Sequence, residues 1–219
     1  PNDKLTYGSF SMKKLLCKLV AATTLVACSS VAMAAADGFF MHAKVGWAQS
    51  DYSTSDFNYM NASSINEEGL SFSPSFGYQV NPNYAVELTY LDWATDVDNI
   101  ALNSNPTGQT TLRNGSINNY SLDVSAKGML PLDQVKEGLG LFAKLGAAYV
   151  QSIKSGGLND SSLGNDYHNT YAIRPITTLG VSYELNEGTV LDLGATHLYK
   201  GGGIQSADFT YIGFARHFG

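Results

Sequence analysis

Cysteine is nearly absent from this sequence, and its placement excludes most thiol chemistry. The chain of 219 residues has two cysteines, Cys17 and Cys28, both close to its beginning. The long remainder therefore has no thiols for a disulfide framework or a cysteine-ligated zinc site. The histidines, which show no ligand spacing, are His42, His168, His197 and His217. We expect neither a metal nor a cofactor.

Charged side chains are also scarce, at 15% of the residues, and the formal net charge is −6. No basic stripe occurs in the sequence, so nucleic-acid binding is not expected. The chain has instead 22 glycines, 13 tyrosines and an aromatic content of 11%. This composition suits β-strands and membrane interfaces better than helices.

The first part of the chain has the pattern of a secretory signal peptide. Met12-Lys13-Lys14 precedes an apolar run to Ala27, and the small residues Ala32 and Ala34 then form a cleavage pattern. The apolar run is too short to cross a bilayer as a helix. Cleavage after Ala34 would remove both cysteines.

A second cleavage site competes with this one. Leu25-Val26-Ala27-Cys28 fits the motif at which bacterial lipoproteins are cut and acylated. We favour cleavage after Ala34, because the strand pattern of the remaining chain describes a domain that needs no lipid anchor. The expected division is an upstream extension at 1–11, a signal peptide at 12–34 and one barrel domain at 35–219.

The stretch from Phe76 to Ala94 predicts two β-strands joined by a tight turn at Asn81-Pro82-Asn83. Apolar side chains alternate with small or polar ones on both sides of the turn, as in a pleated strand with one apolar face. Proline fixes φ and asparagine tolerates left-handed geometry, so this tripeptide suits a turn. The apolar positions are Leu70, Phe72, Pro74, Phe76, Tyr78, Val80, Tyr84, Val86, Leu88 and Tyr90.

The same alternation predicts eight strands, with an asymmetry in their connections. The strands are expected at about 39–51, 70–80, 84–94, 116–129, 139–153, 170–184, 189–200 and 208–218. The even-numbered strands are followed by short turns, whereas the other connections are mostly longer and rich in Asn, Ser, Thr and Gly. These longer connections are 52–68, 96–115, 154–169 and 201–207. Long loops on one side and short turns on the other are typical of an outer-membrane barrel.

A secreted soluble barrel or sandwich is the alternative, since it shows the same alternation with its apolar face turned inward. Aromatic residues near the strand ends favour the membrane barrel, because Tyr and Trp concentrate at bilayer interfaces. These aromatics are Trp47, Tyr78, Tyr84, Tyr90, Tyr120, Tyr149, Tyr183 and Tyr199. Glycine and small residues on the polar face also suit a narrow lumen.

Several segments resemble the OmpA-like transmembrane barrel family. GYQVNP at 77–82 and VELTYLDW at 86–93 resemble its first internal hairpin, and this match is fairly specific. AKGMLPL at 126–132 with LFAKLGAAYV at 141–150, and GVSYELNEGTVLDLG at 180–194, resemble the next two hairpins. GFARHFG at 213–219 is similar to the closing strand.

The resemblance implies an all-β, eight-stranded antiparallel up-and-down barrel in the bacterial outer membrane. It implies extracellular loops, periplasmic termini and contact with outer-membrane lipid and lipopolysaccharide. It also implies insertion by the barrel-assembly machinery, which would read Ile212, Phe214 and Phe218 on the closing strand. Arg216 departs from the family pattern, which has an outward aromatic there. The resemblance further predicts a barrel-only member, without the peptidoglycan-binding domain that full-length members carry.

Strand parity predicts a set of charged side chains in the lumen. Eight strands enclose an interior that side chains just fill, so these charges must pair or reach trapped water. In the resembling family, Glu and Lys at the positions of Glu87 and Lys127 belong to a salt-bridge gate, but other gate positions hold Asp192 and Ser182 here. We therefore expect a network that stiffens the barrel, with a small gated ion pore as the alternative. The predicted network is Lys44, Glu87, Asp123, Lys127, Lys144, Arg174, Glu184 and Asp192.

The loops and one histidine carry the remaining function classes. His197 and Ser206 are residue types that a lipid-modifying enzyme could use as base and nucleophile. Nothing in their spacing indicates that they come within hydrogen-bonding reach, so we expect no enzyme activity. Polar loops on a rigid scaffold commonly carry binding, and the first loop is acidic at Asp51, Asp56, Glu67 and Glu68. The expected function is structural or adhesin-like, with host or surface ligands as partners.

Overall fold

A computed structural model describes residues 38–51, 60–66, 68–102, 111–156 and 169–218 of the protein. Side chains are described for 38–51, 69–93, 118–153 and 169–218. The expected extension and signal peptide lie outside these ranges. Within them, no helix is long and apolar enough to cross a bilayer.

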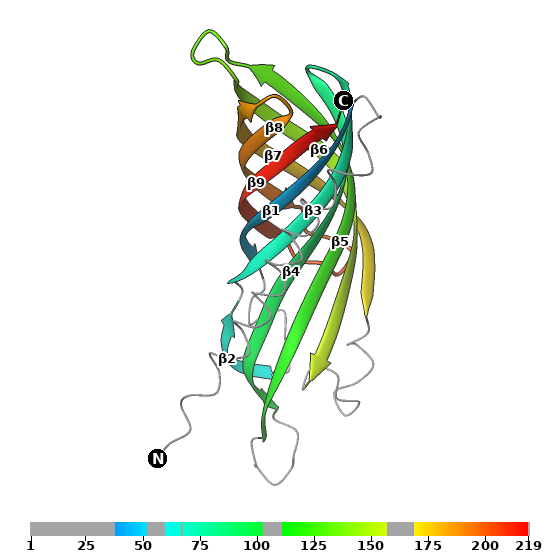
Figure 1. The fold of residues 1–219 in the computed structure, drawn as a ribbon. Helices are drawn as coiled ribbons and strands as arrows, with labels where there is room; N and C mark the ends of the chain where they lie inside the picture. Colours follow the sequence, from blue (N-terminus) through cyan, green and yellow to red (C-terminus); the bar gives the residue numbers. More distant parts are fainter. Residues whose placement is uncertain (1–37, 52–59, 67, 103–110, 157–168, 219) are drawn as a thin grey trace, which may run out of the picture.

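Eight strands form a closed antiparallel barrel. Each of the eight pairs with the next one along the chain, and the last returns to the first, where Phe218 lies opposite Phe39. Figure 1 shows the strands winding around one axis at a common tilt. This confirms the expected up-and-down barrel. Its strands are β1 (Phe39–Ser50), β3 (Glu68–Asn81), β4 (Tyr84–Leu102), β5 (Thr111–Pro131), β6 (Leu139–Gly156), β7 (Thr170–Asn186), β8 (Thr189–Leu198) and β9 (Ala207–Phe218).

A further strand, β2 (Met60–Asn66), continues the line of β3 alongside the far part of β4. Beyond Ala94, β4 keeps pairing with β5 as far as Leu102 and Thr111. These strands project past the rest of the barrel in Figure 1. The expected loops at 52–68 and 96–115 were therefore too long, because backbone pairing continues through polar and apolar residues that show no clear alternation.

The two ends of the barrel differ. The turn end carries the connections at 82–83, 132–138 and 187–188, together with residues 38 and 218. Its turns are set locally: Asn83 donates its backbone N–H to Asn81 Oδ1 at 2.9 Å, and Gly138 and Gly188 have φ of 76° and 77°. Such positive φ values suit glycine. The opposite end is called the loop end below.

The outer face of the barrel is an apolar belt. In β9, buried residues alternate with exposed ones from Ala207 to Arg216. The exposed set confirms that the apolar parity faces outward, where a soluble barrel would have to cover it. The belt includes Val86, Leu88, Leu122, Val124, Leu145, Leu179, Leu193, Ile212 and Phe214. Exposed aromatics on the same face include Trp47, Tyr78, Tyr84, Tyr90, Tyr149 and Tyr199.

Inside the barrel, glycines make room for inward-facing rings. A Cβ atom on Gly77 would collide with the ring of Phe40, and one on Gly180 would collide with the ring of Phe142. Gly194 faces the ring of Tyr211 in the same way. Small residues on the inward parity thus serve a packed interior, with large side chains seated on glycine positions of neighbouring strands.

Candidate functional site

Glu87 on β4 is the centre of a charged group in the lumen. Lys44 Nζ from β1 donates to Glu87 Oε1 at 2.5 Å, and Lys144 Nζ from β6 lies 2.8 and 2.7 Å from the two carboxylate oxygens. Thr89 adds a hydroxyl donor at 3.1 Å. Three strands therefore converge on one carboxylate that is 1% exposed.

Asp192 on β8 holds a second, looser part of the same group. Lys127 Nζ stands 3.6 Å from Asp192 Oδ2, and His42 Nε2 stands 3.5 Å from the same oxygen. Both distances exceed those of good hydrogen bonds. His42 Nδ1 also lies 3.9 Å from Glu87 Oε1, so the imidazole sits between the two carboxylates.

The charges in this group balance. Lys44, Lys127 and Lys144 face the carboxylates of Glu87, Asp123 and Asp192, and all six side chains are buried. Asp123 lies directly opposite Thr89 in the β4–β5 register. Burying charges away from water is costly unless they are paired, and these three cations and three anions compensate one another. We call these six residues the charge cluster.

Arg174 and Glu184 from the predicted network do not join the charge cluster. Both lie on β7, where Thr178 pairs with Lys144 and Ser182 pairs with Asp192. At the rise of a strand, Arg174 lies roughly 13 Å along β7 from Thr178, whereas Glu184 lies roughly 7 Å beyond Ser182 toward the turns. Glu184 is exposed at the turn end.

The pairing within the charge cluster also differs from the sequence expectation. The suggested Glu87–Lys127 pair is not formed: Glu87 takes Lys44 and Lys144, while Lys127 faces Asp192. His42 was left out of the predicted network, although it shares the inward parity of Lys44 and could have been found by parity alone. Parity fixes which residues face the lumen, whereas pairing depends on strand stagger.

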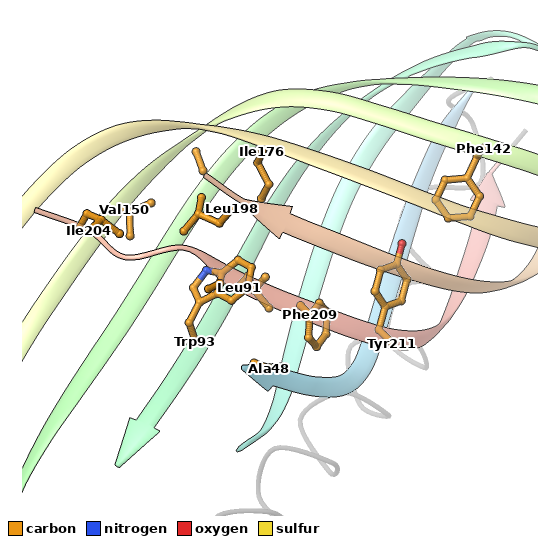
Figure 2. Packing of buried hydrophobic residues seen from close by; sticks show 12 residues of the cluster. Ala48, Leu91, Trp93, Phe142, Val150, Ile176, Leu198, Ile204, Phe209 and Tyr211 are labelled. Carbon is orange, nitrogen blue, oxygen red and sulfur yellow. The ribbon is translucent and has the colours of Figure 1, made fainter. Parts of the chain in front are cut away.

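A layer of apolar side chains fills the lumen on the loop-end side of the charge cluster. Along β4, Glu87 and Thr89 are followed by Leu91 and Trp93, and the Trp93 side chain is fully buried. Figure 2 shows Leu91 and Trp93 inside the barrel with other buried apolar side chains of the cluster. Trp93 Nε1 donates to Ser121 Oγ at 2.9 Å, which satisfies its one polar atom. The apolar layer consists of Leu91, Trp93, Val150, Ile176, Leu198, Ile204 and Phe209.

The β8–β9 connection contributes to this layer from the loop end. Gly201 and Ile204 pair in an isolated bridge, and Gly201, Gly202 and Gly203 all have positive φ. This tight turn directs Ile204 inward, where it is 2% exposed. Arg174 on β7 holds the turn: its Nε donates a hydrogen bond to the Tyr199 carbonyl oxygen at 3.2 Å, and its Nη2 donates one to the Lys200 carbonyl oxygen at 2.6 Å. The connection is thus a lid, defined as residues 199–206.

At the turn end the lumen widens into a cavity of about 460 Å³, which we call the vestibule. Phe40, Lys127 and His217 line its inner part, and Asp133 and Glu184 lie nearer the turns. The rings of Phe40 and His217 stack with centroids 5.0 Å apart. From turn end to loop end, the lumen therefore holds the vestibule, the charge cluster, the apolar layer and the lid.

His197 and Ser206, the residues considered for catalysis, have separate partners. His197 Nδ1 lies 2.7 Å from Asp208 Oδ1 on the outer face, whereas Ser206 Oγ donates to Asp51 Oδ2 at 3.1 Å. The Ser206 contact ties the lid to Asp51, the residue after β1, and the His197 contact joins β8 to β9. Among the described residues, no three His, Cys, Asp or Glu side chains are grouped as a metal site requires.

A family model and three solved structures resemble this chain. The model of the OmpA-like transmembrane domain matches residues 34–205. The crystal structure of Neisserial surface protein A has a TM-score of 0.54 and 17% identity, covering 83% of this chain and 98% of that one. No curated protein sequence matches the chain.

Two further outer-membrane proteins have lower scores. OprG from Pseudomonas aeruginosa has a TM-score of 0.49 and 13% identity, covering 83% of this chain and 97% of its own. Ail, the attachment invasion locus protein of Yersinia pestis, has a TM-score of 0.47 and 14% identity, covering 83% of this chain and 99% of its own. At such identities the likeness concerns the fold alone, and the match to the Neisserial protein is the one that supports it.

Proposed function

This chain belongs to the OmpA-like transmembrane domain family, and from that premise we propose that it is a closed outer-membrane scaffold with a structural or surface-interaction role. Its loop-end connections would carry contacts with host or surface ligands, while the barrel holds them rigidly. Family membership and the barrel fold make it an integral outer-membrane β-barrel protein. The proposal concerns what that barrel does.

The apolar layer is the observation that carries this proposal. Ions need a continuous polar path, and an apolar constriction in a narrow pore tends to shed its water. Trp93, Leu198 and the lid residue Ile204 are buried together inside the lumen, and the lid covers them on the loop-end side. A lumen filled in this way favours a role on the outside of the barrel over steady transport through it.

Planar-bilayer recording tests the closed scaffold against the ion pore. We expect wild-type protein to give no steady conductance, and we expect Glu87→Ala to leave the current trace unchanged, because the apolar layer persists. Frequent current steps in the wild type, suppressed or enhanced by Glu87→Ala, would instead favour a gated pore. A second sample without protein controls for detergent-induced leaks.

The orientation proposed for the barrel places the turn end in the periplasm and the loop end outside the cell, as in barrels with short periplasmic turns. An epitope inserted within 103–110 should then bind antibody on intact cells. The same epitope within 133–137 should bind only after the cells are permeabilised. The reverse labelling would invert the topology.

Attachment assays test the surface-interaction role. Replacing residues 103–110 and 157–168 with short Gly-Ser linkers should lower attachment of expressing cells to a host-cell layer, with the amount of heat-modifiable barrel unchanged. A matched variant with a Gly-Ser replacement of 133–137 should attach like the wild type. Equal attachment by all three would leave the purely structural role.

The closing strand supports insertion by the barrel-assembly machinery, which remains part of the proposal. Ile212 and Phe214 are exposed on the outer face, whereas Phe218 is 8% exposed and lies opposite Phe39. Arg216 extends along the outside and donates to Thr189 Oγ1 at 2.6 Å and to the Glu187 carbonyl oxygen at 3.2 Å. A satisfied Arg at the interface would disturb the signal little.

The proposal includes no enzyme activity. Ser206 is hydrogen-bonded to Asp51, and His197 is hydrogen-bonded to Asp208. Ser206 and His197 are therefore not arranged as nucleophile and base. We propose that lipid and lipopolysaccharide surround the outer belt as a solvent and are not modified by the protein. Mass spectra of lipid A from cells with and without the protein should be identical, and a new acylation pattern would overturn this point.

A further inference from the structure

Lys127 differs from the other two lysines of the charge cluster. Lys44 and Lys144 both donate to Glu87, whereas Lys127 Nζ stands 3.6 Å from Asp192 and 4.5 Å from the centre of the Phe142 ring. The carboxylate that faces this ammonium, that of Asp192, therefore stands farther away than the acceptor in a good hydrogen bond. A nearly buried ammonium with unfilled donors favours an acceptor that reaches it from the vestibule, which it lines.

The vestibule has the size and walls of a small-molecule site. Its volume of about 460 Å³ falls within the roughly 300–1,000 Å³ of such pockets, which are mostly apolar with a few polar groups. Phe40, Met129, Leu139 and Val190 give it apolar walls. Lys127 lies at its inner end, four residues before Pro131, where β5 finishes.

The charge along the vestibule changes sign with depth. Asp133, in the β5–β6 turn, and Glu184, two residues before the end of β7, line the outer part. Asp133 Oδ1 accepts the Gly138 N–H at 3.2 Å, while Glu184 is exposed and has no ion pair within the described part of the chain. These carboxylates would repel a simple anion at the entrance, and Lys127 would repel a simple cation at the inner end.

We propose that the vestibule binds a small zwitterion with an apolar body, of the size of a dipeptide, with its carboxylate toward Lys127 and its ammonium toward Glu184. A neutral zwitterion matches both ends of the vestibule and leaves the balance of the charge cluster unchanged. Its apolar side chains fit against Phe40, Met129 and Val190. The inference rests on the proposed function only for the compartment from which the ligand enters, which would be the periplasm.

Nuclear magnetic resonance titration of the barrel in nanodiscs tests the site, with dileucine as the probe. Amide signals of Gly140 and Ser182, which line the vestibule, should shift as the probe saturates the site. The C-terminal amide of dileucine lacks the carboxylate and should bind about tenfold more weakly or worse, since hydrogen bonds to charged groups contribute roughly 1.5–3 kcal/mol. N-acetylation removes the ammonium and should weaken binding less, because Glu184 is open to solvent.

Protein variants test the same two contacts from the other side. Lys127→Met should weaken dileucine binding about tenfold or more, and Glu184→Gln should weaken it a few-fold. The matched control is Lys136→Met, at the same end of the barrel. Lys136 Nζ lies 4.5 Å from the centre of the Tyr183 ring and does not line the vestibule, so this variant should bind like the wild type.

The inference is overturned if dileucine causes no saturable shifts, if its C-terminal amide binds equally well, or if Lys127→Met binds like the wild type. If Lys127→Met fails to give a folded, heat-modifiable band, the analogue series on the wild-type barrel decides alone. Because the titration uses nanodiscs, it is independent of orientation and conductance. Its failure would leave the closed scaffold standing, and current through the wild-type barrel would leave the vestibule standing.

Discussion

On the inward face of β4, Glu87 and Thr89 are followed by Leu91 and Trp93, so one strand contributes to both the charge cluster and the apolar layer. β6 does the same, with Lys144 in the cluster and Val150 in the layer. The two regions share strands, parity and burial, yet one is held by ion pairs and the other by packing. The lumen thus changes from polar to apolar with depth.

The two regions also differ in how well their atoms are satisfied. The apolar layer has one polar side-chain atom, Trp93 Nε1, and it is hydrogen-bonded. In and around the charge cluster, both nitrogens of His42, both carboxylate oxygens of Asp192 and the hydroxyl of Tyr211 are buried without a hydrogen-bond partner among the described residues. Such atoms call for ordered water. We therefore expect a wet cluster beside a dry layer.

The largest expected effect comes from breaking the centre of the charge cluster. Glu87→Leu leaves the ammonium groups of Lys44 and Lys144 buried without their shared acceptor. Removing one partner of a buried pair typically costs roughly 3–5 kcal/mol. Urea unfolding of the barrel in liposomes should show this loss. Adding Lys144→Met to the same chain removes one of the two stranded charges, leaves two cations facing two carboxylates, and should restore much of the loss.

A wild-type unfolding curve for Glu87→Leu would show that water already screens both lysines. In that case the charge cluster would be a solvated pore lining and the contrast with the apolar layer would be sharper than proposed. Thr89→Val is the matched control, since it removes only the neutral donor at 3.1 Å from Glu87. Its cost should be about 1 kcal/mol.

A slightly smaller loss is expected from opening the apolar layer. Trp93→Ala removes a fully buried ring that packs edge-on against Phe209 at 6.4 Å. Truncation of a buried Trp costs roughly 3–5 kcal/mol, and partial collapse or water entry through the lumen should keep this case near the lower limit. The same liposome unfolding measurement gives the loss, and planar-bilayer recording should show small currents absent from the wild type. Silence in the bilayer would mean that the lid alone closes the barrel.

The fold was largely predictable because apolar side chains occupy every second position on the outer face. Alternation from Leu70 to Tyr90 and the turn at Asn81-Pro82-Asn83 depend on local geometry, and lipid covers every outward position alike. The length of β4 and β5 was not predictable, because backbone pairing continues beyond Ala94 through polar and apolar residues that show no clear alternation. Local sequence contains no signal for such pairing.

The interior was predictable only in part. Parity placed Lys44, Glu87 and Lys144 inside the barrel, but which lysine reaches Glu87 depends on the stagger of β1, β4, β5 and β6. Leu91 and Trp93 share the inward parity of Glu87, and this was a readable sign of the apolar layer. Arg174 also has inward parity, but the lid carbonyl groups bind it, and they are brought there by the turn at Gly201–Gly203.

A change on the outer face sharpens the comparison between lumen and belt. Leu122 is 48% exposed and flanked on β5 by the inward residues Ser121 and Asp123. Leu122→Arg places a charge in lipid and should cost roughly 2–4 kcal/mol if the side chain lies near the bilayer midplane. Ser121→Ala, the matched inward change, should cost about 1 kcal/mol through the lost Trp93 hydrogen bond. Equal costs on the two faces would mean that the belt is not covered by lipid.

The smallest effect should come from loosening the lid without altering the layer beneath it. Arg174→Met keeps the length of the side chain and removes the donors to the Tyr199 and Lys200 carbonyl oxygens. Because Arg174 is only half-buried and water can replace it, we expect a global loss of about 1 kcal/mol. The local effect should be clearer: the amides of Gly201 and Ile204, which bond to each other's carbonyl oxygens at 2.9 and 3.0 Å, should exchange hydrogen roughly tenfold faster. Lys136→Met, at the opposite end, should leave their exchange unchanged. If Arg174→Met does so as well, Ile204 packing in the apolar layer is what keeps the lid shut.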